Sequence, residues 1–259
     1  MPKASKPGAS LTIDGAVAVI AMDDQKKRNA LSHDVVADLE RHVDAVMADD
    51  SVRAIVLTGE GGVFCAGGDI SGFDSGEPLR RRMPRLHRLS SKIAHSEKPT
   101  LAAVEGGAFG GGLSLALLCD QIVAADDARF CSSFAKIGLM PDLGLLATLP
   151  ARVGVGRAKE IMMLADDVPA DQALADGMVD ELTLPGGALA RAKEIAGEFA
   201  AMAPLALAYS KATIMRQPMT LQQELAWEGH GQGLLFTSED LQEGRAAFFE
   251  KRKPAFKGI

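Results

Sequence analysis

The segment from Val104 to Asp120 constrains the fold of this chain more than any other part of its sequence. It begins as an apolar strand, breaks on glycines and continues as an apolar helix. Three consecutive glycines, Gly110 to Gly112, stand where that helix begins, although each glycine weakens a helix by roughly 1 kcal/mol relative to alanine. Glycine lets a ligand approach the backbone closely, and the first turn of a helix has unpaired N–H groups. We therefore expect these N–H groups to bind a ligand oxygen that gains negative charge.

A second strand followed by glycines occurs earlier in the chain. Residues 53–59 form an apolar, β-branched run that is typical of a buried strand. The glycine-rich segment 60–70 follows it. Two such junctions can each contribute one N–H to the same oxygen, which would make a two-donor oxyanion hole. Glycine-rich turns are also common as simple tight connections, so the spacing alone leaves both interpretations open.

Together these segments resemble the crotonase (enoyl-CoA hydratase/isomerase) superfamily. Four motifs stand in the family's order and span roughly residues 10 to 256. They are Asn29-Ala30-Leu31; Phe64 with Ala66, Gly67, Gly68, Asp69 and Ile70; Gly106 and Ala108 with Gly110 to Gly112; and the run from Glu243 to Pro254. The resemblance implies that the N–H groups of Gly68 and Gly111 polarise the carbonyl of an acyl-CoA thioester.

The resemblance also implies an α/β fold with two regions. The first, residues 1–200, would be a crotonase-like spiral of ββα turns that binds acyl-CoA and carries out catalysis. The second, residues 201–259, would be a helical C-terminal region that packs subunits into a homotrimer or a hexamer formed by two trimers.

Local patterns agree with strands and helices in alternation up to about residue 185, followed by helices. Ser32 is expected to cap a helix that runs to about Met47, with apolar side chains on one face. From Gly187 onward the pattern is helical, with breaks near Pro204 and Pro218. The expected strands are Val17 to Met22, Thr100 to Glu105 and Gln121 to Ala125.

Composition narrows the class of protein. The chain has 259 residues, 47% of them hydrophobic, enough for one large domain or a core with a small appendage. It has no run of roughly 18 or more apolar residues, so no membrane span is expected. Its start shows no signal core and its end is not a peroxisomal address, so we expect a cytoplasmic protein. The net charge of −6 argues against general nucleic-acid binding.

Neither the cysteines nor the histidines show the spacing of a metal site. The three cysteines are odd in number and lack a Cys-x-x-Cys pair, and no His-x-x-x-His pair occurs. We predict structural or surface roles for all eight, which are Cys65, Cys119, Cys131, His33, His42, His87, His95 and His230.

The chain departs from the hydratases at two positions. In hydratases of the family, two glutamates hold the water that is added to the double bond. The corresponding residues here are Ser114 and Phe134, and neither is a carboxylate. Hydration requires both delivery of hydroxide and transfer of a proton, so the loss of both groups should raise the barrier greatly. The sequence therefore disfavours simple hydration.

One carboxylate stands elsewhere in the expected pocket. The segment from Phe134 to Gly144 resembles that of Δ3,Δ2-enoyl-CoA isomerases and of ring-opening epoxyphenylacetyl-CoA isomerases. The resemblance implies that Asp142 shuttles the proton. A single carboxylate suits a 1,3-proton shift, because it removes a proton from C2 and returns it to C4. Apolar neighbours, several of them leucines, would raise the pKa of Asp142 toward a useful range.

Other interpretations of Asp142 stay open. Pro141, Asp142 and Gly144 are typical of a turn in which the carboxylate caps the following helix. Relatives usually have a second glycine where Leu145 stands, so the pocket differs here. The same position is a nucleophile in 4-chlorobenzoyl-CoA dehalogenases. The alternatives are a hydrolase or dehalogenase that uses Asp142 as nucleophile, a hydratase-like enzyme, and a non-catalytic acyl-CoA-binding protein.

The resemblance also indicates which residues contact the substrate. Lys26 and Arg28 lie where the family contacts the nucleotide, and the backbone of Ala66, Gly67, Asp69 and Ile70 is expected to meet adenine and thioester. Further candidates for contact with CoA or the acyl group are Phe109, Phe134 and Leu139; Lys251 to Lys253 with Phe256; and Arg80, Arg81, Arg82, Arg85 and Arg88. We expect no cofactor and no metal, since coenzyme A is part of the substrate.

Overall fold

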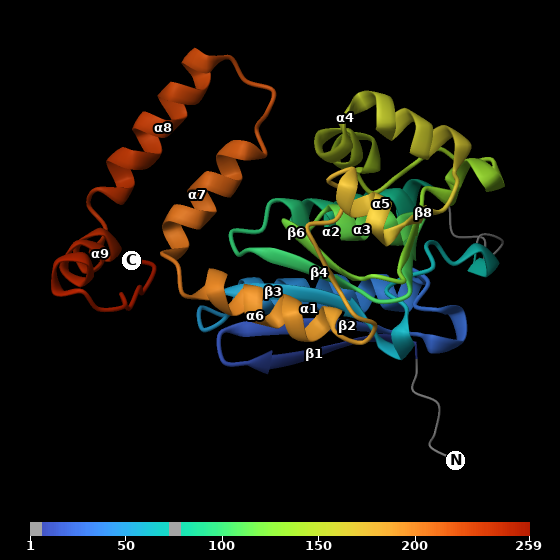
Figure 1. The fold of residues 1–259 in the computed structure, drawn as a ribbon, viewed down its shortest axis with the longest axis horizontal. Helices are drawn as coiled ribbons and strands as arrows, with labels where there is room; N and C mark the ends of the chain where they lie inside the picture. The colour runs from blue at the N-terminus through green and yellow to red at the C-terminus, as the bar shows by residue number, and fades with distance from the viewer. Residues whose placement is uncertain (1–6, 73–78) are drawn as a thin grey trace.

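Two β-sheets organise the computed structural model, which describes residues 7–72 and 79–259 (Figure 1). The larger sheet has the strand order β1-β2-β3-β4-β6-β9, and the smaller has the order β5-β7-β8. The larger sheet consists of β1 (Gly8–Asp14), β2 (Val17–Asp23), β3 (Ala54–Gly59), β4 (Thr100–Val104), β6 (Gln121–Ala125) and β9 (Glu181–Thr183). The smaller consists of β5 (Gly107–Phe109), β7 (Arg129–Cys131) and β8 (Val168–Pro169).

Strands β3 and β4 are parallel neighbours in the larger sheet, with Leu57 opposite Ala102. Parallel neighbours end at the same edge of a sheet, so the glycine-rich segments that follow them begin side by side. An isolated bridge between Cys65 and Ala108 continues this pairing beyond the strands, and a second bridge, between Leu31 and Gly68, joins the segment after β2 to the segment after β3. The sheet therefore brings together two segments that lie about 40 residues apart in the sequence.

The four inner strands of the larger sheet, β2, β3, β4 and β6, are buried on both faces, which explains why they are apolar at consecutive positions. Along β2, Ala18, Ile20 and Met22 enter the main core, whereas Val17 and Val19 face a second core. The second core lies beneath α6, which contacts β2, β3, β4, β6 and β9. The main core lies on the other face, under α1 to α3 and the smaller sheet. The α/β fold expected from the sequence is confirmed.

The helices and short 3-10 turns connect the strands. The 3-10 turns are η1 (Gln25–Lys27), η2 (Glu60–Gly62), η3 (Ile70–Gly72) and η4 (Ser133–Ile137). The helices are α1 (His33–Met47), α2 (Leu79–Ala94), α3 (Gly111–Leu117), α4 (Leu145–Leu164), α5 (Ala170–Ala175), α6 (Ala188–Ala200), α7 (Pro204–Ile214), α8 (Leu221–Leu235) and α9 (Glu239–Glu250).

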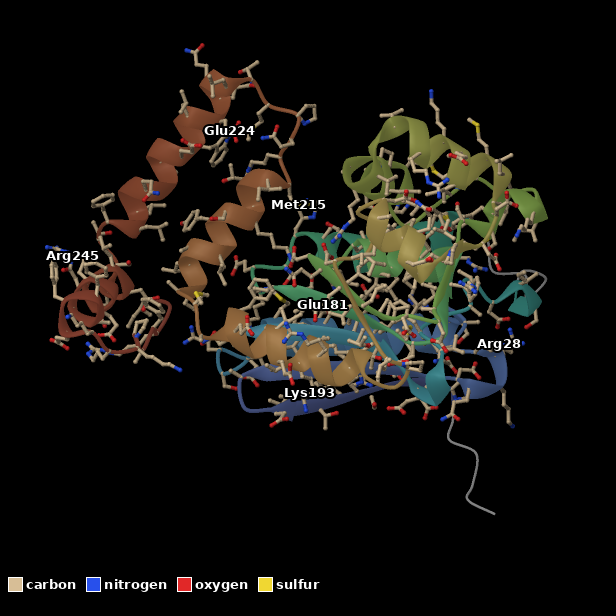
Figure 2. The ribbon with its side chains drawn as sticks, in the orientation of Figure 1. Arg28, Glu181, Lys193, Met215, Glu224 and Arg245 are labelled. Carbon is tan, nitrogen blue, oxygen red and sulfur yellow. The ribbon has the colours of Figure 1, made fainter. Side chains whose placement is uncertain are left out.

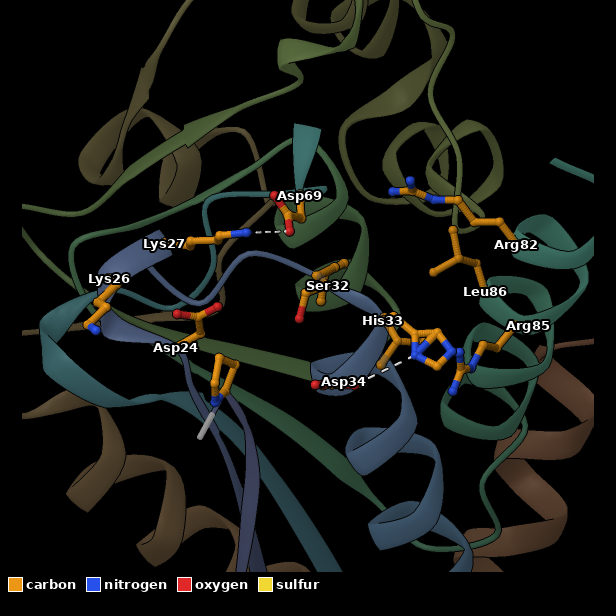
Figure 3. Close-up of a pocket in the computed structure, with 13 residues that line it drawn as sticks. Asp24, Lys26, Lys27, Ser32, His33, Asp34, Asp69, Arg82, Arg85 and Leu86 are labelled. Carbon is orange, nitrogen blue, oxygen red and sulfur yellow. Dashed lines mark hydrogen bonds and ion pairs between the residues drawn. The ribbon is translucent and has the colours of Figure 1, made fainter. Parts of the chain in front are cut away.

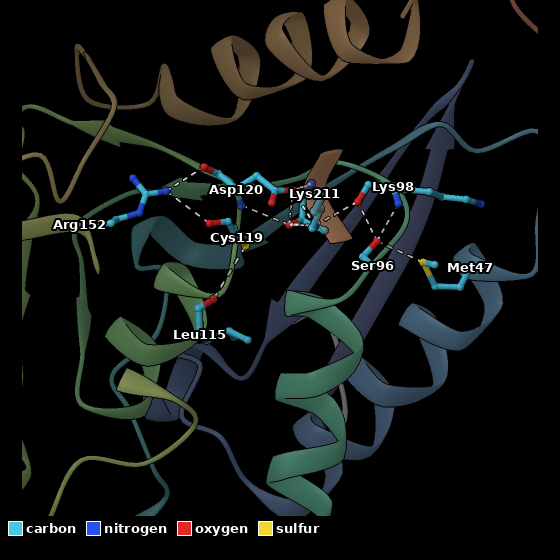
Figure 4. A network of polar contacts seen from close by, with 9 residues as sticks. Met47, Ser96, Lys98, Leu115, Cys119, Asp120, Arg152 and Lys211 are labelled. Carbon is cyan, nitrogen blue, oxygen red and sulfur yellow. Dashed lines mark hydrogen bonds and ion pairs between the residues drawn. The ribbon is translucent and has the colours of Figure 1, made fainter. Parts of the chain in front are cut away.

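The C-terminal helices α7 to α9 extend away from the sheets, as Figure 2 shows at Met215, Glu224 and Arg245. The side chain of Lys211 attaches α7 to the core, because its ammonium group lies 2.7 Å from the carboxylate of Asp120 (Figure 4). Several large apolar side chains of this region are exposed: Leu221, Leu225, Trp227, Leu234, Phe236, Phe248 and Phe249. The division of the chain at residue 200 and the trimer contact stay predictions.

Most elements expected from the sequence are present. Ser32 caps α1, since its hydroxyl accepts a hydrogen bond from the Val35 N–H at 3.3 Å. Pro204 begins α7 and Pro218 lies between α7 and α8. The pattern did not reveal β1 or the smaller sheet, whose strands of two or three residues are too short for a periodic signal. No helix in the described part of the chain is long and apolar enough to span a membrane.

Candidate active site

The peptide group between Gly67 and Gly68 has a fixed orientation. The carbonyl of Gly67 accepts a hydrogen bond from the Leu31 N–H at 2.7 Å. In a planar trans peptide the C=O and the following N–H point in opposite directions. The N–H of Gly68 therefore points away from the backbone of Leu31. Gly67 and Gly68 both line a cavity, where this N–H is available to a ligand.

The second donor comes from the first residue of α3. The carbonyl of Gly110 accepts from the Ser114 N–H at 3.1 Å, so by the same geometry the Gly111 N–H points out of the helix. A side chain at Gly111 would begin 3.7 Å from the Gly68 nitrogen and 3.2 Å from methyl groups of Leu31 and Leu143. The two glycines therefore lie against each other, and the absence of side chains keeps both N–H groups accessible.

A narrow cavity of about 70 Å³ contains these glycines. Its walls are mostly apolar, and Arg82 and Asp142 are its charged lining residues. The structure brings eight predicted site residues to this cavity, namely Ala66, Gly67, Gly68, Ile70, Gly111, Phe134, Leu139 and Asp142. Leu31 and Leu143 also line it; in the sequence they stand out only as part of a motif and as an apolar neighbour of Asp142. Leu86, Ser133 and Ile137 were not predicted, because α2 and η4 are brought to the cavity by the tertiary fold.

Asp142 has the environment of a carboxyl that is kept from water. Burial raises its pKa, while the neighbouring Arg82 and His87 oppose that rise. Within the described part of the chain, its buried Oδ1 has no hydrogen-bond partner. Helix α4 begins after Gly144, and the Leu145 N–H donates to the backbone carbonyl of Asp142 at 3.1 Å, not to its carboxylate. The interpretation of Asp142 as a helix cap is therefore not supported, and its carboxyl is left to face the cavity.

Ser114 and Phe134, which stand at the positions expected for the two glutamates of hydratases, supply no acid–base group. Ser114 is fully buried, and its hydroxyl donates a hydrogen bond to the Gly110 carbonyl at 3.3 Å. This bond adds to the backbone bond on the same carbonyl, so Ser114 supports the turn that presents the Gly111 N–H. Phe134 places an aromatic ring in the cavity wall. Among the described residues that line this narrow cavity, Asp142 is thus the one carboxylate.

A second, more polar cavity of about 410 Å³ adjoins the first, and the two share Leu31, Arg82 and Leu86 (Figure 3). Its basic lining residues come from two regions of the sequence: Lys26, Lys27, Arg82 and Arg85. Asp69 lines it as well and forms an ion pair with Lys27 at 2.7 Å, which lowers the pKa of the Asp69 carboxyl. Two of the basic segments predicted to contact CoA therefore line one cavity beside the glycines, the first through Lys26 and the second through Arg82 and Arg85.

Some predicted contact residues lie elsewhere. Arg28 and Phe109 are not among the described residues that line either cavity; Arg28 has left-handed backbone and its carbonyl accepts from the Ala66 N–H. In the C-terminal cluster, Arg252 is paired with Glu243 and Glu250. The side chains of Arg80 and Arg81 lie outside the described part of the structure.

The cysteine thiols are buried, and the described acidic residues form no metal site. Cys65, Cys119 and Cys131 are free and buried, and burial raises the pKa of Cys65 and Cys119 to about 12, so these thiols stay protonated. Over residues 7–72 and 79–259, no group of three His, Cys, Asp or Glu side chains is arranged to hold a metal ion. The two glycine N–H groups and Asp142 are the arrangement on which the chemistry can be built.

Comparison with known proteins identifies the family. The sequence model of the enoyl-CoA hydratase/isomerase family matches residues 12–259. The chain belongs to this family. It is 34% identical over 244 residues to a short-chain-enoyl-CoA hydratase of Clostridium acetobutylicum, a match that covers 93% of this chain and 94% of the relative. It is 35% identical over 246 residues to a crotonyl-CoA hydratase of Syntrophomonas wolfei, and this match covers 93% of this chain and 94% of the relative.

Solved structures of the family have the same fold. The crystal structure of an enoyl-CoA hydratase from Polaromonas sp. JS666 superposes with a TM-score of 0.92 at 34% identity. The match covers 96% of this chain and 99% of that one. The crotonase resemblance is thereby confirmed, and the chain is an acyl-CoA enzyme of the hydratase/isomerase family. These relatives are named as hydratases, so the isomerase subtype expected from the sequence stays a prediction.

Proposed function

We propose that this family member is an enoyl-CoA isomerase that moves a double bond from C3–C4 to C2–C3 of an acyl-CoA. The observation that carries the proposal is the pairing of one half-buried carboxyl, Asp142, with the N–H groups of Gly68 and Gly111 in one cavity. Such donors stabilise an oxygen that becomes negative, and one carboxylate suffices to carry a proton between two carbons.

The reaction uses these groups in two steps. The Asp142 carboxylate removes a proton from C2, and the electron pair of that C–H bond forms the C1–C2 double bond of an enolate. The thioester oxygen carries the negative charge and accepts hydrogen bonds from Gly68 and Gly111. In the second step the enolate collapses, C2–C3 becomes the double bond, and C4 takes the proton from Asp142. Atoms and charge balance without water or any cofactor.

The cavities suit an acyl-CoA in this orientation. The apolar walls around Leu31, Ile137 and Leu139 fit an acyl chain. The larger cavity carries Lys26, Lys27, Arg82 and Arg85, whose charges complement the phosphates of coenzyme A. Coenzyme A enters as part of the substrate, so the proposal requires no further cofactor.

The deciding experiment offers the protein two substrates in parallel. We expect a 3-trans-enoyl-CoA to be isomerised and crotonyl-CoA to be hydrated slowly or not at all. Asp142→Asn keeps the size of the side chain but cannot carry a proton, so turnover should fall by about three orders of magnitude or more while acyl-CoA affinity changes little. The exposed Asp127→Asn is the matched control and should behave as wild type.

Hydration is the second candidate, because the relatives compared above are named hydratases. A hydratase would have to activate water with Asp142 alone, since Ser114 and Phe134 stand at the positions of the two glutamates in hydratases. Rapid hydration of crotonyl-CoA without isomerisation would overturn the isomerase proposal and establish this candidate. A covalent adduct on Asp142, detected by mass spectrometry after incubation with substrate, would indicate the nucleophilic mechanism instead.

A further inference from the structure

Asn29 belongs to a sequence motif, yet the proposed chemistry gives it no role. Its side chain is completely buried, with 0% of the residue exposed. Its backbone has a φ of 58°, in the left-handed region that asparagine tolerates better than most residues. A buried carboxamide needs partners for its oxygen and for its two N–H groups. The identity of those partners indicates what the residue does.

The carboxamide of Asn29 joins two loops. Its Oδ1 accepts a hydrogen bond from the Asp24 N–H at 2.9 Å, within its own loop. Its Nδ2 donates to the carbonyls of Glu60 at 2.8 Å and Val63 at 2.7 Å, in the loop that follows β3. The side chain therefore fastens the beginning of the glycine-rich segment to residues 24–29.

The backbone on either side of Asn29 holds the end of the same segment. The carbonyl of Arg28 accepts from the Ala66 N–H at 2.9 Å, and the Leu31 N–H donates to the Gly67 carbonyl at 2.7 Å. With the two side-chain bonds of Asn29, residues 28–31 hold segment 60–67 at four points. The hydrogen bond from the Leu31 N–H to the Gly67 carbonyl fixes the Gly67–Gly68 peptide, whose N–H is the proposed oxyanion donor.

We propose that Asn29 is a positioning residue for the oxyanion hole. Its carboxamide holds segment 60–67 against residues 28–31, so that the bond between Leu31 and Gly67 forms and aims the Gly68 N–H at the thioester oxygen. Asn29 itself touches no reacting atom. The inference rests on the proposed function, because it concerns the same oxyanion hole, and it adds a residue on which that hole depends.

The test separates positioning from binding. In Asn29→Ala we expect kcat to fall about 10- to 100-fold, since a donor displaced by about 1 Å loses much of its effect. The dissociation constant for acyl-CoA should change by less than about threefold, because Phe134, Leu139, Arg82 and Arg85 line the cavities from elements to which Asn29 makes no hydrogen bond. Asn29→Ser, whose hydroxyl can donate to one of the two carbonyls, should lie between wild type and Asn29→Ala.

The absorption spectrum of a bound chromophoric ligand measures directly how strongly the Gly68 and Gly111 N–H groups polarise its carbonyl. The absorption of bound 4-(dimethylamino)cinnamoyl-CoA should shift to longer wavelength in the wild type, because the two N–H groups polarise its carbonyl. The shift should be smaller in Asn29→Ala and intermediate in Asn29→Ser. Ile195→Ala, which removes a buried side chain of α6 on the opposite face of the sheet, is the control for lost stability and should keep the full shift.

Each outcome decides the inference. A full shift and unchanged kcat in folded Asn29→Ala would overturn it, and so would an equal loss of kcat in Ile195→Ala. If Asn29→Ala fails to fold, the same measurements on Asn29→Ser decide. A wild-type protein that binds the probe without any shift would contradict the proposed oxyanion hole itself, and the inference would fall with it.

Discussion

At the scale of single residues, Asp142 sits in a place that disfavours its charged form. Burial raises its pKa, and one of its oxygens is buried without a hydrogen-bond partner. A carboxyl whose pKa is higher in the folded than in the unfolded protein binds more protons when folded. Folding stability therefore falls as pH rises from the unfolded pKa through the folded one, and stays reduced at neutral pH.

Asp142→Asn should therefore stabilise the protein at neutral pH while it removes activity. The neutral amide avoids the cost of a buried charge, so its melting temperature at pH 7 should exceed that of the wild type. The difference should shrink as the pH falls from the folded pKa of Asp142 to the lower, unfolded one, and below both values it should vanish because the carboxyl is then uncharged in either state. Thermal melts of both proteins across pH check this, and a lower melting temperature for the variant at pH 7 would contradict it.

Arg82 should set the pKa of the same carboxyl, that of Asp142. Its positive charge lowers the pKa of Asp142 against the effect of burial, and it lines the same cavity. Removing the charge in Arg82→Gln should raise the pKa of Asp142, so the acidic limb of the kcat/KM profile should move to higher pH. Arg82→Lys keeps the charge and should move the limb less.

The control for this prediction is Arg85→Gln, one turn further along α2. Arg85 lines the larger cavity and faces Glu40 at 3.9 Å. Its replacement should weaken substrate binding without moving the acidic limb, because it is not among the charges that act on Asp142. Equal movement of the limb in both variants would show that Arg82 has no special effect on Asp142.

At the scale of elements, an ion pair joins α7 to the core. Lys211 contacts Asp120 at 2.7 Å, and the same carboxylate accepts from the Thr100 N–H at 2.7 Å (Figure 4). Asp120 follows α3 closely, and its backbone carbonyl accepts from Arg152 of α4. The pair thus connects the C-terminal helices to the end of the helix that begins with Gly111.

Lys211→Met should loosen α7 while leaving the sheets intact. Lys211 is mostly buried, and hydrogen bonds to charged groups contribute about 1.5–3 kcal/mol, so a loss in that range is expected. Amide hydrogen exchange should quicken in α7 more than in β3 or β4. A double-mutant cycle with Asp120→Asn isolates the pair, and additive effects of the two substitutions would contradict a direct contribution.

At the scale of the whole molecule, the C-terminal helices expose more apolar surface than a free subunit usually does. Large apolar side chains of α8 and α9 lie on the surface, Leu225 and Phe248 among them. Phe248, Phe249 and Phe256 also line a cavity of about 600 Å³ between these helices. Extensive exposed apolar surface marks a contact with another protein, and the family resemblance implies a second copy of the chain.

We expect the purified protein to form trimers or hexamers through this region. Light scattering coupled to gel filtration measures the mass. Leu225→Glu places a charge in the expected contact and should shift the protein toward smaller species, whereas Gln222→Glu, an exposed position on the same helix, should not. A wild-type protein that runs as a monomer would show that α7 to α9 have another role.

The sequence by itself determined the features that depend only on residues close together in the chain. Continuous apolar runs marked β2, β3, β4 and β6, because strands buried on both faces require them. Ser32 marked the start of α1, since a cap acts on the next few N–H groups. The glycine-rich junctions and Asp142 stood out by their residue types and by the family resemblance.

Only the tertiary structure decided what those features form together. The parallel pairing of β3 with β4 placed Gly68 beside Gly111, and the bond from Leu31 to Gly67 oriented the donor. The same packing gathered basic residues of two distant segments around one cavity, and it left Oδ1 of Asp142 buried without a hydrogen-bond partner. These outcomes depend on contacts between residues far apart in the chain, and local propensity carries no information about such contacts.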